Sequence, residues 1–158
     1  NRRLPRDLRI QGLRAAIEEL ERMDRPHLLG ASPERAFWEG EAWNQLGLIP
    51  GASKAAFRNA EEAFMGAFEM GRKDTETLCR ACGANAVGRE AEMLAKLQAL
   101  GEQVPQLGCR YWILRARWIR ELEQQGALPA GSADAACEAA RSRCGSPRDL
   151  PIWERVCR

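Results

Sequence analysis

The chain has 158 residues, of which 45% are hydrophobic and 29% charged, enough to bury one core and too apolar for general disorder. Its formal net charge is only +2, so no strong field directs it toward nucleic acid or an anionic membrane. It contains 25 Ala but only three Val, six Ile and two Thr. Because strands favour β-branched residues and Ala favours helix, we predict an all-α protein.

Apolar residues at helical spacing, interrupted by Gly, Pro and Ser, divide the chain into about six to seven helices. The first is predicted from about Pro5 to Met23, and the sixth, from about Pro105 to Gln125, has the broadest apolar face and should be central. The others are expected at about 32–47, 53–70, 74–82, 85–101 and 132–144, followed by a short terminal segment. Serines placed before helices should cap them: Ser32, Ser53 and Ser132.

Two stretches of the chain resemble each other at an offset of 79 residues. Gly47–Ser53 and Gly126–Ser132 share their order of glycine, proline and serine, although only ten of the 79 aligned pairs are identical. Connections between helices need such residues without any duplication. We therefore predict one helical domain over residues 1–158, a compact disulfide-stapled bundle, with a weak two-fold repeat (half-repeats 1–79 and 80–158) as the alternative.

The cysteine content points to an oxidising compartment. An even number of cysteines predicts disulfides in an exported protein, and metal or redox chemistry in a cytosolic one. A single CxxC and the other spacings match no ordinary zinc module. We therefore expect structural disulfides in a periplasmic or extracellular protein whose targeting segment lies outside this sequence. The six disulfide candidates are Cys79, Cys82, Cys109, Cys137, Cys144 and Cys157.

Spacing restricts which cysteines can pair. Cys137 and Cys144 lie seven residues apart in one predicted helix, about 10.5 Å along its axis, which is too far for a disulfide. They should bond to separate neighbours. We expect the pairs Cys144–Cys157, Cys109–Cys137 and Cys79–Cys82; in an alternative, Cys79 or Cys82 bonds to Cys109 and a free thiol remains elsewhere.

Acidic side chains lie beside aromatic ones in the segment from Trp38 to Trp43. A carboxylate against an apolar wall can act as the general acid of a glycoside hydrolase. Because Glu39 and Glu41 point to different faces of a helix, we favour buried tryptophans with solvated glutamates. His27 has no nucleophilic partner that the sequence identifies. We predict no enzymatic activity, no catalytic residue, no metal site and no cofactor.

One cluster combines basic and aromatic residues, a combination that suits single-stranded nucleic acid or anionic lipid. Its tryptophans lie on the broad apolar face of the sixth predicted helix, and acidic residues follow it directly, so we favour a core helix. The cluster consists of Arg110, Arg115, Arg117 and Arg120 with Trp112 and Trp118.

Because the sequence shows a stapled helical scaffold without visible chemistry, elimination favours a protein that binds another protein. We predict an exported, periplasmic-type protein-binding protein, such as an inhibitor, an immunity protein against a secreted toxin, or an adaptor of an envelope machine. Its partner would be another protein, with no nucleic acid and no direct insertion of this segment in a membrane. The alternatives are a ligand-binding or sensory domain of a membrane-anchored protein, and a small cell-wall hydrolase that uses Glu39 or Glu41.

Overall fold

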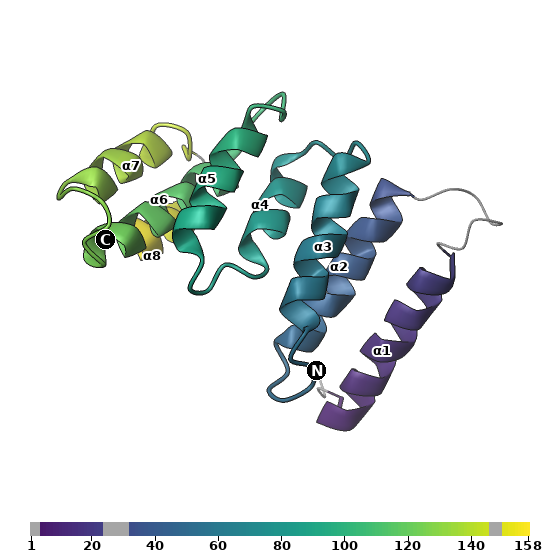
Figure 1. Cartoon of the computed structure of the whole chain (residues 1–158). Helices are drawn as coiled ribbons and strands as arrows, with labels where there is room; N and C mark the ends of the chain where they lie inside the picture. Colours follow the sequence, from purple (N-terminus) through teal and green to yellow (C-terminus); the bar gives the residue numbers. More distant parts are fainter. Residues whose placement is uncertain (1–3, 24–31, 146–149) are drawn as a thin grey trace. The chain divides into compact units, whose positions relative to one another are not determined.

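The computed structural model of the chain describes residues 4–23, 32–145 and 150–158. These residues form eight helices and no strand, which confirms the all-α prediction (Figure 1). The short terminal segment, which is not among the predicted helices, contains the eighth helix. The helices are α1 (Arg6–Met23), α2 (Pro33–Gly47), α3 (Ala56–Glu69), α4 (Thr75–Gly83), α5 (Glu90–Gly101), α6 (Cys109–Gln124), α7 (Ser132–Arg141) and α8 (Leu150–Cys157).

The chain divides into two compact units, which we describe separately. Unit 1 comprises residues 1–72 with Gly83–Asn85 and contains α1 to α3, whereas unit 2 comprises Lys73–Cys82 with Ala86–Arg158 and contains the remaining helices. In unit 1, α1 packs on α2 and α2 on α3; in unit 2, α5 packs on α6 and α6 on α7 in the same order. One domain over residues 1–158, with half-repeats 1–79 and 80–158 as the alternative, stays a prediction.

In unit 1, small residues allow α2 and α3 to approach closely. A Cβ atom added at Gly40 would lie 2.7 Å from the Phe64 ring. Phe64 is fully buried and its ring meets that of Phe37 edge to face, with centroids 5.4 Å apart. The aromatic and alanine side chains of α3 thus form the core of this hairpin, as their helical spacing predicts.

The opposite side of α2 packs against α1 over a smaller apolar cluster. Ile17 of α1 and Leu46 of α2 are its buried centre, and Trp43 is packed against it while remaining partly exposed. The Arg6 guanidinium of α1 donates a hydrogen bond to the carbonyl of Pro50 at 2.6 Å. The α1–α2 interface therefore combines a narrow apolar contact with polar side chains around it.

In unit 2, α6 packs against α5, α7 and α8, as its predicted central position requires. Trp118 of α6 is buried. Trp153 of α8 donates its indole N–H to the carbonyl of Cys137 at 3.0 Å, which ties α8 to α7. The core-helix interpretation of the tryptophans is therefore correct for Trp118.

Two disulfides staple unit 2. Cys109 bonds to Cys144 with Cα atoms 5.0 Å apart, and Cys137 bonds to Cys157 at 5.6 Å. The prediction that Cys137 and Cys144 bond to separate neighbours is confirmed, but both predicted partners are wrong. The predicted Cys79–Cys82 pair is also wrong, because both residues are buried thiols that are not joined in a disulfide.

The antiparallel α6–α7 hairpin explains why the observed disulfide partners differ from the predicted ones. Cys109 begins α6 and Cys137 lies five residues into α7, so they are about 22 Å and about 8 Å from the turn between these helices at 1.5 Å per residue. Cys144, just beyond the end of α7, lies at the level of Cys109. The last turn of α8 then brings Cys157 to Cys137, in the middle of α7.

Candidate functional site

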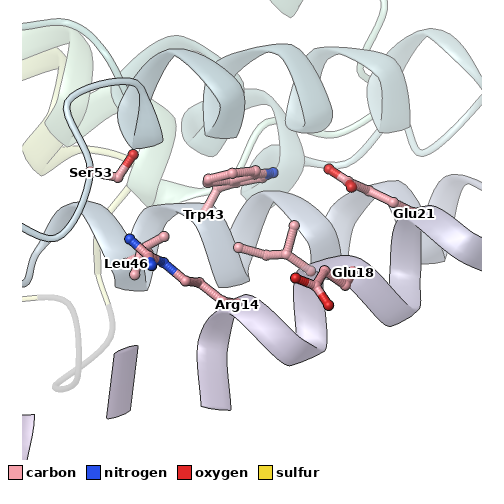
Figure 2. Close-up of a pocket in the computed structure, with 7 residues that line it drawn as sticks. Arg14, Glu18, Glu21, Trp43, Leu46 and Ser53 are labelled. Atoms are coloured by element: carbon pink, nitrogen blue, oxygen red, sulfur yellow. The ribbon is translucent and has the colours of Figure 1, made fainter. Parts of the chain in front are cut away.

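A pocket of about 270 Å³ opens between α1 and α2 in unit 1 (Figure 2). Its walls combine apolar, aromatic and charged side chains. The helix α1 contributes four residues, α2 two, and the loop after α2 one. They are Arg14, Ile17, Glu18 and Glu21 of α1, Trp43 and Leu46 of α2, and Ser53.

The inner wall of the pocket is apolar. Ile17 is 3% exposed and Leu46 is 1% exposed, and both belong to the cluster that joins α1 to α2. Trp43 comes three residues before Leu46 on the same helix, so both side chains lie on the face toward α1. Because Trp43 is only half-buried, part of its indole ring is accessible to an occupant.

The charged side chains lie at opposite ends of the pocket. In Figure 2 the Arg14 guanidinium extends toward Leu46 and Ser53, the Glu21 carboxylate lies beyond the indole of Trp43, and the Glu18 carboxylate lies apart from it, close to α1. Glu18 and Glu21 are three residues apart, which places them on one face of α1. Arg14 Nη2 donates a hydrogen bond to the carbonyl of Ala52 at 3.2 Å, and this bond fixes the cationic end.

Such a pocket suits a small occupant with an apolar stem and a polar end. Drug-sized ligands need cavities of about 300–1,000 Å³, and this pocket is smaller. A single amino-acid side chain is of the appropriate size. An aromatic face beside carboxylates favours a cation, and the guanidinium end offers donors to a carbonyl or carboxylate oxygen.

Sequence reasoning did not find this pocket. The buried tryptophans predicted from the sequence include Trp43, which the structure leaves half-buried. The missed signal is that Arg14, Glu18 and Glu21 recur at intervals of four and three residues, which puts them on one stripe of α1. The stripe borders the apolar face that contains Ile17, so it can line a pocket once α2 packs there.

The other sequence candidates on α2 are placed differently from the prediction. Trp38 is 58% exposed, whereas the sequence predicts it to be buried. Glu39 and Glu41 are half-buried and not fully solvated. The reason is that Ala36, Gly40 and their neighbours face α3, which turns Trp38 outward. His27 lies outside the described residues.

Cys79 and Cys82 lie on α4, away from solvent. Burial raises the pKa of the Cys79 thiol to about 12, and the nearby Arg110 and Arg80 guanidinium groups lower it only in part. A protonated thiol is a poor nucleophile and a poor metal ligand. Within the described ranges, no group of three or more His, Cys, Asp or Glu side chains is arranged to bind a metal ion.

The basic and aromatic cluster of α6 is divided by the fold. Trp118 is buried in the core, whereas Trp112 is half-buried with the Arg143 guanidinium 3.9 Å from its ring centroid. Arg117 forms an ion pair with Glu121 at 3.1 Å, and Arg110 forms one with Glu76 at 3.6 Å. The cluster therefore does not form one continuous basic and aromatic surface.

Among the residues that the structure describes, no helix has both the length and the apolar character needed to span a bilayer. Comparison with known proteins found no family model, no curated protein and no solved structure that matches this chain.

Proposed function

We propose that this chain is an exported helical protein that binds another protein, and that the pocket between α1 and α2 receives a side chain of that partner. The two intramolecular disulfides indicate an oxidising, non-cytosolic compartment. A periplasmic inhibitor, an immunity protein or an envelope adaptor would act in such a compartment. The pocket between α1 and α2 would be the surface by which such a protein binds its partner.

The observation that carries the proposal is the size and composition of the pocket. Binding energy at protein interfaces is concentrated in a few anchor side chains that fill pockets on the partner. A pocket of about 270 Å³, with the buried side chains of Ile17 and Leu46 at its base, matches one anchor. Because these two side chains also form the α1–α2 interface, the pocket is largely formed before binding.

A small-molecule ligand is the second candidate, as expected of a ligand-binding or sensory domain. The accessible indole of Trp43 and the two carboxylates at one end of the pocket favour this alternative, because an organic amine could bind there without any protein attached. The two candidates differ in what remains bound when the protein is isolated from its native compartment.

Capture from an envelope extract distinguishes them. We expect the wild-type protein to retain a specific partner that the Trp43→Leu variant loses, because the substitution removes the aromatic wall of the pocket. Trp38→Leu is the matched control on the same helix: Trp38 is exposed outside the pocket, and its substitution should leave capture intact. Circular dichroism of both variants confirms folding. Equal capture by all three proteins would contradict the proposal, and a bound amine without a protein would favour the second candidate.

A further inference from the structure

We propose that the anchor is a basic side chain, and that its guanidinium or ammonium group lies at the end of the pocket formed by Trp43, Glu18 and Glu21. This inference rests on the proposed function and specifies the chemistry of the partner's anchor. Three observations support it: the pairing of neighbouring charges on α1, the position of Trp43, and a similar arrangement elsewhere in unit 1.

The carboxylates at this end of the pocket are available to an incoming cation. Glu19, between them in sequence, forms an ion pair with Arg22 at 3.1 Å. Glu18 and Glu21 form no ion pair within the described part of the chain. Arg14 lies one helical turn before Glu18, but its guanidinium donates to the Ala52 carbonyl. Both carboxylates belong to one stripe of α1 and line the pocket, so a cation bound there would be attracted by two negative charges.

Trp43 supplies the other requirement of a cation site. A guanidinium or ammonium group over an indole face is attracted by the ring quadrupole, and tryptophan is the most favourable ring for this contact. The apolar side chains of Ile17 and Leu46 would contact the methylene stem of arginine or lysine. The pocket thus matches both parts of a long basic side chain.

Unit 1 contains a similar combination of an aromatic ring, a carboxylate and a cation on the other side of α2. There, the Arg72 guanidinium lies 3.6 Å from the centroid of the Phe37 ring. The same guanidinium forms an ion pair with Glu34 at 2.8 Å. An aromatic ring of α2, a carboxylate and an arginine therefore form one site within this unit. The pocket has the ring and the carboxylates, and we infer that the partner supplies the arginine or lysine.

The Arg14 end determines the direction in which the anchor enters. Its guanidinium, near Ser53, would repel the cationic tip and attract a carbonyl or carboxylate oxygen. A basic residue would thus place its backbone toward Arg14 and its charged group toward Glu18 and Glu21. The occupant we propose is an internal residue of the partner protein, with its backbone carbonyl toward Arg14; binding of a free or C-terminal basic amino acid is the other outcome that the test separates.

The test measures binding of small probes to the whole chain through the indole N–H signal of Trp43 in NMR spectra, assigned with Trp43→Phe. The probes are N-acetyl-arginine amide and its neutral isostere N-acetyl-citrulline amide. We expect the arginine probe to bind about tenfold more tightly, because the citrulline probe lacks the charge. N-acetyl-arginine with a free carboxylate, measured in parallel, distinguishes a C-terminal from an internal residue.

Charge-neutral variants locate the site. Glu18→Gln with Glu21→Gln preserves side-chain size and should remove most of the preference for arginine over citrulline. Glu19→Gln is the matched control, since Glu19 pairs with Arg22 and does not line the pocket; it should leave the preference unchanged. Equal binding of the two probes, or equal effects of both sets of substitutions, would overturn the inference.

Failure of this inference is distinguishable from failure of the proposed function. If partner capture is lost in Trp43→Leu but unchanged in the Glu18→Gln/Glu21→Gln variant, the pocket binds a protein without selecting a cation. If the arginine probe binds with the expected preference but no protein is captured through the pocket, the cation site is supported and the proposed function is wrong.

Discussion

At the scale of single residues, Gly40 controls how closely α2 approaches α3. A Cβ atom there would lie 2.7 Å from the ring of the fully buried Phe64. We therefore expect Gly40→Ala to destabilise the protein by about 1–3 kcal/mol, the usual range for overpacking a core. Denaturant-induced unfolding measures the change.

Gly66→Ala is the control for this substitution. Gly66 lies inside α3, and an added Cβ would have no atom within 4 Å beyond its chain neighbours and the nearby backbone of its own helix. Replacing it should stabilise the protein by about 0.5–1 kcal/mol, because alanine loses less conformational entropy than glycine in a helix. Destabilisation by both substitutions would show that helix geometry, and not the Phe64 ring, explains the result.

The thiols of Cys79 and Cys82 are expected to resist alkylation in the folded protein. Because burial raises the pKa of Cys79 to about 12, its reactive thiolate is scarce at pH 8. Both thiols should react with iodoacetamide promptly only after unfolding, as followed by mass spectrometry without reductant. Fast alkylation of the native protein, or absence of both thiols after unfolding, would contradict the buried, reduced pair.

The raised pKa of Cys79 also sets the sign of a pH effect. The unfolded state ionises near the ordinary thiol pKa, whereas the folded state keeps its proton up to about pH 12. The contribution of this thiol to stability is therefore complete below pH 9 and is lost as the pH rises from 9 to 12. Cys79→Ala should reduce the dependence of the unfolding midpoint on pH over that interval.

At the scale of elements, a side chain from α6 caps the N-terminus of α7. Glu123 accepts hydrogen bonds from the backbone N–H of Ala133 at 2.6 Å and of Gly131 at 3.0 Å. These bonds lower the pKa of the Glu123 carboxyl. The Ser132 hydroxyl instead donates to the carbonyl of Pro129 at 2.6 Å, so its predicted capping role is wrong.

This cap predicts a pH-dependent contribution to stability. Because the folded pKa of Glu123 is below its ordinary value, the contribution is present above that value and is lost as the pH falls through the folded pKa. Glu123→Gln should therefore lower the thermal midpoint at pH 7, with the difference from wild type disappearing on acidification. A difference that persists at pH 2 would show that the charge of Glu123 is not its cause.

Much of the element structure could be predicted because it depends on neighbouring residues. Proline and glycine at positions such as Pro33 and Gly126 mark where helices begin and end. The capping of α7 could not be predicted, since it requires α6 to return alongside α7 and place Glu123 there. The exposure of Trp38 was missed for a similar reason: local spacing does not show which face of α2 meets α3.

At the scale of the whole molecule, the disulfide partners and the pocket share this dependence on packing between helices. The periodicity of α6 predicted its central position because a broad apolar face must be covered on several sides. The partner of Cys109 depends instead on the antiparallel direction and lengths of α6 and α7. Likewise, Glu18 and Glu21 acquire a candidate role only where Trp43 of α2 packs opposite α1.

The disulfides lie in unit 2, so their reduction should affect the two units unequally. They close segments separated by 35 and 20 residues in sequence. The entropy of loop closure assigns about 4 and about 3 kcal/mol to such loops. Unit 1 is stabilised by the packing of α2 on α3 and of α1 on α2, without a disulfide among its described residues. We expect reduction to weaken the protection of α6 to α8 while α2 and α3 retain most of theirs.

Hydrogen exchange, with and without reductant, measures this protection helix by helix. Paired variants then separate the two disulfides. Cys137→Ser with Cys157→Ser should increase exchange mainly in α8, because α8 would lose its covalent link to α7 and keep the Trp153 hydrogen bond to residue 137 and the Arg141–Trp153 contact at 5.6 Å. Cys109→Ser with Cys144→Ser should act instead on the outer ends of α6 and α7, where that disulfide lies. If each pair increased exchange equally in every helix, the stabilisation would belong to the chain as one cooperative structure, and its assignment to unit 2 would be wrong.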